Sequence, residues 1–371
     1  MSELRPSRED MQTVVKYLNP SLLDFIEQLQ SFEYIPEISK VADLMDFHTS
    51  TIWKFMKLLK QRGLAFQGLI DMHKLGVDEI ILVFDEYIEL KSMFKGLMRE
   101  YAPILPWGTY VKYLVPKGFA EAFLNELYSR LGVEPLEVYI PTFTIYGKPD
   151  VKRFYDMNSR RFVINWDELY KMVEVAPREI IPKEAVKKSK FDELDLLILR
   201  VLERSPFESI KNVVRILNEE FKALKPYNYV LVLRHYNNHI EARGVIKGVR
   251  LRSEKLILEP SLKVMITANG NPLEMLRFLK VLTTHPYFHD AYVNTADNVA
   301  VTFATLPVEL AHDLSIFMDK LKRVGIIRYW KITYLDSRRF RRYALPVKMF
   351  SENINNLFTL SDDELLVREL T

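Results

Sequence analysis

The same order of elements occurs twice along the 371-residue chain, and this internal repeat limits what the chain can fold into. In each copy, three short amphipathic stretches with helical spacing precede a segment in which apolar runs at strand spacing alternate with helical runs. The first copy begins after Pro20 and the second at Phe191. We therefore expect an α+β fold made of two similar units.

The three helical stretches of each copy predict a helix-turn-helix. In the first copy Ser21 is expected to cap the first helix, Ile38–Leu44 marks the second, and the third runs from residues 48–50 to Gly63. The short turn between the last two helices and the chain after Gly63 are typical of a winged helix-turn-helix. Such domains are predicted over 19–74 and 191–258, the second with helices at 191–202, Ser209–Phe221 and Asn228–Arg243.

A βαββαβ order, typical of a ferredoxin-like domain, follows each helix group, over 75–147 and 259–345. In the first, helices are expected at Leu90–Tyr101 and Phe119–Leu131, and strands at Ile80–Phe84, near Ile104, and at Tyr110–Val115 and Leu136–Tyr146. In the second, helices are expected at Pro272–His285 and Pro307–Val324, and strands at Leu262–Ala268, Phe288–Thr295, Asn298–Ala304 and Ile326–Leu335. Residues 1–18 are interpreted as an arm, 148–190 as a linker, and 346–371 as a tail with a helix capped by Ser361 and Glu364.

Composition excludes several function classes. Because the chain has no cysteine, it cannot form disulfides, cysteine-bound iron-sulfur clusters or a thiol nucleophile. The glycine-rich nucleotide-binding motifs G-x-x-x-x-G-K-[ST] and G-x-G-x-x-G are also absent from the sequence. No apolar run approaches the roughly 20 residues that span a bilayer, and the first ten residues are charged, so we expect a cytoplasmic protein without membrane contact. Because the net charge is only +3, any contact with DNA must be local.

Three stretches resemble the Lrp/AsnC family of transcription regulators, in the archaeal form. Asp192–Asp195 leading into Ile198–Leu202 looks like that family's opening helix, and Ser50–Ile52 with Lys60–Leu64 resembles the start and end of its recognition helix. Val293–Val301 is similar to the turn that joins its two central strands. The resemblance implies ferredoxin-like (RAM-like) domains that dimerise and can bind an amino acid-like effector. It predicts a sequence-specific regulator of double-stranded DNA that is not an enzyme and needs no cofactor.

Two departures from the family bear on this interpretation. The family glycine of the turn is Ala296, and in the first copy Pro106–Tyr110 keeps only a glycine, which puts effector binding in doubt. Family members are usually single units, so we expect the two copies to pair within the chain as a pseudo-dimer, with a homodimer of whole chains as a further expectation. The candidate effector residues are Thr295, Ala296, Asp297 and Asn298.

Candidate DNA contacts lie on the polar sides of the two third helices. Hydroxyl, ammonium, guanidinium and amide groups there can reach phosphates and base edges. A solvated helix face is the alternative for the first helix, and a helix group that only packs is an equal alternative for the second. The candidates are His48, Thr49, Ser50, Thr51, Lys54, Lys57 and Lys60 in the first helix, and Arg234, His235 and Asn238 in the second.

Two further groups are open to a functional and a structural interpretation. Arg338, Arg339, Arg341 and Arg342 can bind phosphate or a partner, or can be solvated. The pairs His235 with His239 and His285 with His289 have the spacing of metal ligands on a helix. Because the sequence fixes no third ligand for either pair, we expect no metal site.

One segment indicates a competing function. His285–His289, followed by Tyr292 and Asn298, resembles the siroheme decarboxylases, enzymes with the same two-part fold. Those enzymes are typically single-unit subunits, and the first copy has no comparable histidines around Pro103–Tyr110, so the regulator is preferred. A third alternative is an interaction factor of the transcription machinery that uses Arg338–Arg342 and the acidic tail Asp362–Glu369.

Overall fold

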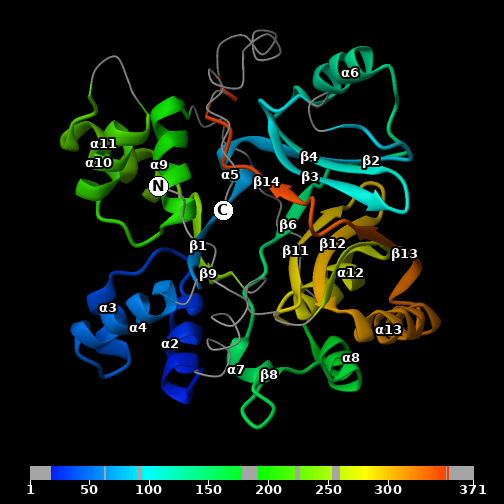
Figure 1. Cartoon of the computed structure of the whole chain (residues 1–371), viewed down its shortest axis with the longest axis horizontal. Helices are drawn as coiled ribbons and strands as arrows, with labels where there is room; N and C mark the ends of the chain where they lie inside the picture. Colours follow the sequence, from blue (N-terminus) through cyan, green and yellow to red (C-terminus); the bar gives the residue numbers. More distant parts are fainter. Residues whose placement is uncertain are drawn as a thin grey trace. The chain divides into compact units, whose positions relative to one another are not determined.

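The computed structural model describes residues 18–61, 64–89, 94–177, 191–221, 226–252, 260–347 and 349–350. The chain forms two compact units that do not follow its order (Figure 1). Unit 1 consists of Met1–Leu69, Thr142–Pro182 and Gly248–Ile332, and unit 2 of Ile70–Pro141, Lys183–Lys247 and Thr333–Thr371. Unit 1 therefore combines the first helix group with the second ferredoxin-like segment, and unit 2 combines the second helix group with the first such segment.

The first helix group, in unit 1, consists of α2 (Pro20–Ser31), α3 (Ile38–Leu44) and α4 (Thr49–Gln61). Asn19, not Ser21, caps α2: its side chain accepts a hydrogen bond of 2.9 Å from the Leu22 N–H. Pro20 then takes the first helical position, where its missing N–H costs nothing. The group packs around the fully buried Phe25. Gly63, the expected end of the third helix, lies outside the described residues.

A two-stranded sheet follows the helix groups, formed by β1 (Phe66–Ile70) and β9 (Ile246–Leu251). The strands that were expected as the two wings are thus paired. Gln30 of α2 holds β9 in place within unit 1. Its buried side chain accepts a hydrogen bond from the Leu251 N–H of β9 and donates one to the Pro149 carbonyl, both at 2.8 Å. One helix is thereby bonded to chain segments that lie far away in the sequence.

The sheet of unit 1 confirms the βαββαβ order of the second copy. Its strand order is β13-β10-β12-β11-β6, antiparallel where Val264 of β10 faces Ala304 of β12. The expected helix from Pro307 starts later, since β12 runs to Pro307 and a 3₁₀ turn at Val308–Leu310 intervenes. The elements are β6 (Phe143–Ile145), β10 (Ser261–Gly270), α12 (Pro272–Leu282), β11 (Phe288–Asn294), β12 (Val299–Pro307), α13 (Ala311–Arg323) and β13 (Ile327–Leu335), the last in unit 1 as far as Ile332.

The segment interpreted as a linker contains secondary structure. The helix α8 (Trp166–Val175) is capped by Asn165, and the Trp166 ring lies 5.0 Å from that of Phe317 in α13. Before it come the short helix α7 (Val151–Phe154) and the hairpin of β7 (Tyr155–Asp156) with β8 (Arg161–Phe162). Residues 178–190 lie outside the described residues. The part of the linker that is described therefore belongs to the body of unit 1.

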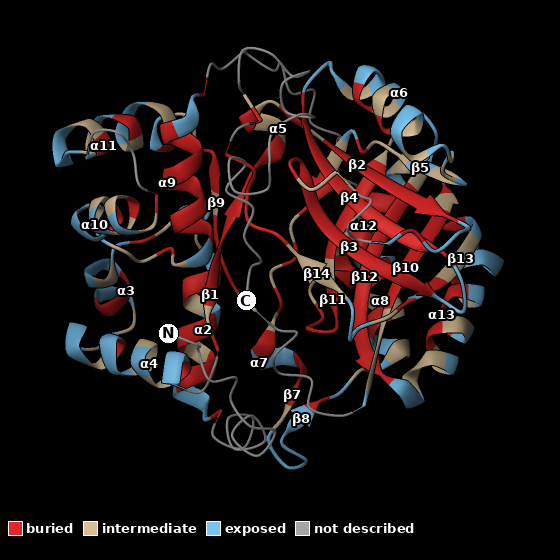
Figure 2. Cartoon of the chain, turned by 45° about the horizontal axis from the view of Figure 1, so that its top comes forward, coloured by how far each residue is buried: buried red, intermediate tan, exposed pale blue. Residues whose placement is uncertain are grey.

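The second helix group, in unit 2, consists of α9 (Glu193–Arg204), α10 (Ile210–Glu220) and α11 (Tyr229–His235). Nearly all of α9 is buried (Figure 2). The third helix, expected as one α-helix to Arg243, instead widens into a π-helix, η2 (Tyr236–Glu241), in which the Ala242 N–H bonds the Asn237 carbonyl at 3.0 Å. Such a widening often marks a functional position.

The sheet of unit 2 differs from the expected βαββαβ order. Its strand order is β5-β2-β4-β3, with β14 also on β3. The predicted helix Leu90–Tyr101 is wrong, because Met98–Leu105 forms β3, and residues 85–89 and 94–97 before it contain no helix. The predicted strand Leu136–Tyr146 is interrupted at Pro141, and its two parts pair with different strands, β5 with β2 and β6 with β11. The elements are α5 (Met72–Leu75), β2 (Val77–Phe84), β3, β4 (Thr109–Pro116), α6 (Ala120–Leu131), β5 (Glu137–Tyr139) and β14 (Arg341–Arg342).

None of the helices in the described part of the chain is both long and apolar enough to cross a membrane. The tail beyond residue 350, with the expected capping pair Ser361 and Glu364, lies outside the described residues.

Candidate functional sites

The outer face of α4 exposes the predicted DNA contacts of the first copy. Ile52 and Leu59 on the opposite side are buried. Six of the seven candidates are exposed and Thr51 is half-buried, and no acidic residue occurs between Thr49 and Gln61. Sequence reasoning missed Trp53, which is 51% exposed on this helix. The exposed candidates are His48, Thr49, Ser50, Lys54, Lys57 and Lys60.

The predicted DNA contacts on the third helix of the second copy do not share one environment. Arg234 and Asn238 are exposed. His235 is only 8% exposed, and its Nδ1 lies 2.9 Å from Oδ1 of Asp195 in α9. The expectation that His235 faces outward with Arg234 is therefore wrong, because its imidazole is held by a buried carboxylate.

Asp195 is the centre of a polar cluster, which we call the Asp195 cluster: Asp192, Asp195, His235 and His239. The Asp195 carboxylate is wholly buried, and His239 Nδ1 lies 3.0 Å from both of its oxygens. Asp192 and Asp195 also form a capping box, each accepting the other's backbone N–H at 3.0 Å. Sequence spacing identified the histidine pair, but its acidic partners come from the start of another helix.

The second histidine pair is divided between two environments. His285 is completely buried, with its ring 4.4 Å from that of Phe154. Its Nδ1 accepts from the Tyr287 N–H at 3.2 Å, so its Nε2 carries the proton and donates to the Val163 carbonyl at 3.3 Å. Burial lowers the pKa of His285 to about 3, which keeps the ring neutral.

His289 has a different position, at the start of β11. Its side chain is half-buried, and its Nε2 lies 3.0 Å from the hydroxyl oxygen of Thr305. Because His285 and His289 contact different partners, the sequence spacing does not translate into a shared metal position.

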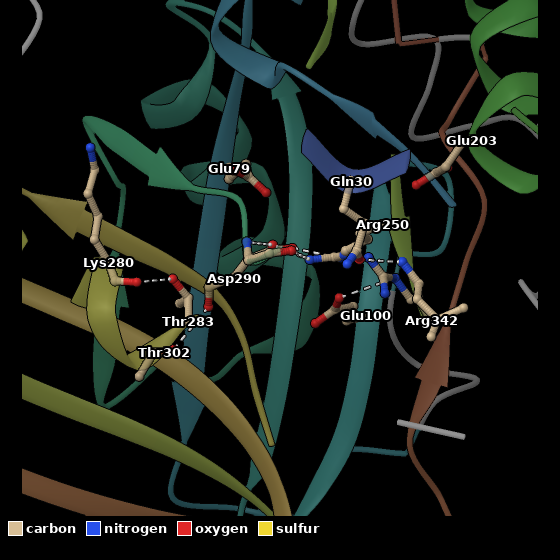
Figure 3. Close-up of polar contacts among 12 residues, drawn as sticks. Gln30, Glu79, Glu100, Glu203, Arg250, Lys280, Thr283, Asp290, Thr302 and Arg342 are labelled. Carbon is tan, nitrogen blue, oxygen red and sulfur yellow. Dashed lines mark hydrogen bonds and ion pairs between the residues drawn. The ribbon is translucent and has the colours of Figure 1, made fainter. Parts of the chain in front are cut away.

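Asp290, the next residue, is part of a buried ion pair that sequence reasoning missed (Figure 3). Arg250 of β9 binds the Asp290 carboxylate through both terminal nitrogens, Nη2 to Oδ2 at 3.0 Å, and the side chains are 8% and 11% exposed. The Gly147 N–H also donates to Asp290 Oδ1 at 3.0 Å, and the Thr302 hydroxyl donates to the Asp290 carbonyl at 3.2 Å. These bonds fix the backbone beside His289.

The candidate effector residues form the turn between β11 and β12. The Asn294 side chain accepts from the N–H groups of Ala296 and Asp297 at 2.9 and 3.0 Å and donates to the Asp297 carboxylate at 2.7 Å. Asn298 has a positive φ of 56°. The Thr295 hydroxyl lies 3.1 Å from that of Thr142. In the structure these polar groups close the hairpin.

The four candidate arginines fall into two pairs. Arg341 and Arg342 form β14, opposite Tyr101 and Glu100 of β3, and Arg342 Nε lies 3.6 Å from a Glu100 oxygen. The side chains of Arg338 and Arg339 are exposed, and Arg339 Nε is 3.8 Å from Asp336. Of the four, Arg338 and Arg339 are therefore the more accessible to a phosphate or a partner. The acidic tail Asp362–Glu369 lies outside the described residues.

No family model and no curated protein matches the chain. Among solved structures, it is similar to the siroheme decarboxylase NirDL, with a TM-score of 0.50 and 9% identity over 91% of this chain and 97% of that one. A second structure of NirDL, in complex with an iron-uroporphyrin III analogue, gives a TM-score of 0.48 and 9% identity over 85% and 90% of the two chains.

The likeness to NirDL confirms the predicted fold class, a winged helix-turn-helix combined with a ferredoxin-like domain. It also overturns the expectation that the chain is no enzyme, because an enzyme has this fold over almost its whole length. The regulator was preferred because such enzymes were expected to be single units. That reason does not hold for NirDL, because its chain matches both copies of this one. At this identity the comparison establishes the fold that the two chains share.

Proposed function

We propose that the chain is an enzyme that removes a carboxylate group from a tetrapyrrole. The observation that carries the proposal is the extent of the likeness to a siroheme decarboxylase, which includes both copies. Since identity is only 9%, no residue role is taken from that enzyme, and the roles below rest on the contacts within this chain.

The reaction makes two demands on the protein. A carboxylate R–COO⁻ loses CO₂, and the carbon that keeps the electron pair takes up a proton to give R–H. The enzyme must therefore hold an anionic substrate and supply one proton. A histidine is suited to the second task because its ordinary pKa lies near neutrality.

His289 is the proposed proton donor. Of the two histidines in the decarboxylase-like segment, His285 is unsuited, because its pKa of about 3 leaves it uncharged and both of its nitrogens are bonded to backbone groups. His289 is half-buried rather than enclosed, and its Nε2 lies 3.0 Å from the hydroxyl oxygen of Thr305. The buried Arg250–Asp290 pair holds its backbone in place.

The test is to incubate the full chain with siroheme without oxygen and to follow the absorption spectrum and the product mass. We expect a spectral change on binding, and a product that is lighter than the substrate by the mass of one CO₂ for each carboxylate removed. His289→Ala should abolish the mass change while binding persists, whereas His312→Ala, an exposed histidine on α13, should have no effect. A wild-type chain that neither binds nor converts siroheme would overturn the proposal.

A second candidate function is binding of double-stranded DNA through α4. The specific observation in its favour is the exposed face that carries Lys54, Lys57 and Lys60 without an acidic neighbour on the helix. Ammonium groups in this arrangement can contact phosphates, and the hydroxyls at the start of the helix can contact base edges. Fluorescence anisotropy with genomic duplex fragments tests it, and failure to bind any duplex at low salt would exclude it.

The remaining parts of the regulator hypothesis stay predictions. They are an amino acid-like effector at Thr295–Asn298, pairing of the two copies as a pseudo-dimer, and a homodimer of chains. Calorimetry with amino acids and sedimentation of the full chain would test them.

A further inference from the structure

We propose that the Asp195 cluster binds one divalent transition-metal ion, with Zn²⁺ as the expected ion. The cluster lies entirely in unit 2 and is separate from the decarboxylase-like segment of unit 1. Each of its four residues can offer one ligand atom, and these atoms all lie within 4.8 Å of one another.

The geometry is close to what a four-coordinate ion needs. Tetrahedral zinc with bonds near 2.0–2.1 Å has ligand atoms about 3.3 Å apart. In the structure His235 Nδ1 and His239 Nδ1 lie 2.9 and 3.0 Å from Asp195 oxygens, and His235 Nδ1 lies 3.6 Å from Asp192 Oδ1. The two imidazole rings are 4.7 Å apart at their centroids. These three distances differ from the tetrahedral value by only a few tenths of an ångström, so small side-chain shifts would let the four ligands surround an ion.

The donor set matches the chemistry of zinc. Imidazole nitrogens and carboxylate oxygens are its usual ligands beside thiolates, and this chain has no cysteine. Each imidazole would carry its proton on Nε2 and turn the Nδ1 lone pair toward the ion. Both histidine Nδ1 atoms already converge on the buried Asp195 carboxylate, so the ligands are positioned before the ion binds.

Burial of its inner residues distinguishes the Asp195 cluster from a group of acidic side chains on the surface. Asp195 is completely buried and His235 is 8% exposed, while the Asp192 side chain is 56% exposed. An ion can therefore enter past Asp192 and His239, and the two inner ligands are held by the surrounding core. Among the described residues, no other group of three or more histidines and carboxylates brings its ligand atoms this close together.

The ion would connect the start of α9 to the place where α11 widens into the π-helix. Asp192 and Asp195 form the cap of α9, and His235 and His239 lie on either side of the change in helix type at Tyr236. Binding would thus fix the third helix of the second group against its first helix. The consequence is a helix group whose stability depends on a metal ion.

The test measures metal content of the tag-free full chain after dialysis against excess Zn²⁺ and then against metal-free buffer. We expect one zinc per chain, and with Co²⁺ the visible absorption of a tetrahedral ion. His239→Gln and Asp192→Asn should each weaken binding roughly tenfold or more. Asp192→Asn is a matched variant, because asparagine caps a helix as well as aspartate does.

His312→Ala serves as the control for a histidine outside the cluster and should keep the full metal content. The proposal is overturned if the wild-type chain retains no zinc, or if the double variant His239→Gln with Asp192→Asn binds zinc as tightly as wild type. Circular dichroism of each variant confirms that the helices persist. The readout is independent of decarboxylation, so failure here leaves the proposed function untouched.

Discussion

Removing the carboxylate of Asp290 should destabilise unit 1 strongly. The Asp290→Ala change leaves the Arg250 guanidinium, 8% exposed, without its two-pronged partner, and it leaves the Gly147 N–H without its acceptor. Breaking a buried ion pair from one side costs about 3–5 kcal/mol, and an unsatisfied N–H adds about 1 kcal/mol or more. Because 11% of the Asp290 side chain is open to water, which can solvate the guanidinium in part, we expect a loss of about 4 kcal/mol.

Tryptophan fluorescence can report this loss for unit 1 alone. Trp53, Trp166 and Trp330 lie in unit 1, whereas Trp107, the fourth tryptophan, lies in unit 2 and is 78% exposed. In a Trp107→Phe background, urea unfolding at neutral pH should therefore give a lower midpoint with an unchanged slope for Asp290→Ala.

The matched control is the double change Arg250→Met with Asp290→Leu. It removes both charges and fills the space with apolar side chains, so it should be less destabilised than Asp290→Ala. A loss below about 1 kcal/mol for Asp290→Ala, or a double variant that is as unstable as the single one, would refute the argument that an unpaired buried charge sets the cost.

Three further outcomes are expected. Changing Lys54, Lys57 and Lys60 to glutamine should reduce the slope of log affinity for duplex DNA against log salt by up to about 2.7, at roughly 0.9 per phosphate contact; an unchanged slope in anisotropy titrations would place the contacts elsewhere. The folded-state pKa of His285, about 3, lies below the ordinary value, so its contribution is complete above about pH 6.5 and is lost toward pH 3. Urea unfolding across this window should show about 1.4 kcal/mol per pH unit from this group, and a folded His285→Asn variant should lack that component. Gly248→Ala should lower the thermal midpoint, because φ is +103° and a Cβ would lie 2.2 Å from the Phe32 carbonyl oxygen; a midpoint equal to wild type would contradict the backbone geometry.

The second ferredoxin-like segment could be predicted from the sequence because its signals are local. Asn271 and Pro272 mark the start of α12, and β10 and β12 are long apolar runs. Each element was therefore placed to within a few residues of its observed bounds. The exposed face of α4 could be predicted for the same reason, since Ile52 and Leu59 fix its inner side.

The features that were missed depend on partners far away in the chain. Met98–Tyr101 was predicted as the end of a helix, with a strand only near Ile104, yet all of Met98–Leu105 forms β3. Arg99 and Glu100 are buried there, and Arg99 pairs with Glu203. Asp195 and His235 are 40 residues apart, so spacing within one helix could not reveal the four-residue cluster. Such pairs are decided by tertiary packing, which a local pattern does not contain.

Unit 1 is assembled from three segments that lie far apart in the sequence, and this affects how it folds during synthesis. Gln30 leaves the ribosome early, but its two hydrogen-bond partners, at Pro149 and Leu251, follow 119 and 221 residues later. At about 5–20 residues per second, the α2 helix waits on the order of ten to forty seconds for Leu251 to be synthesised. During this interval its apolar face has only part of its native cover, so the nascent first third of the chain is the stage most exposed to aggregation and to help from chaperones.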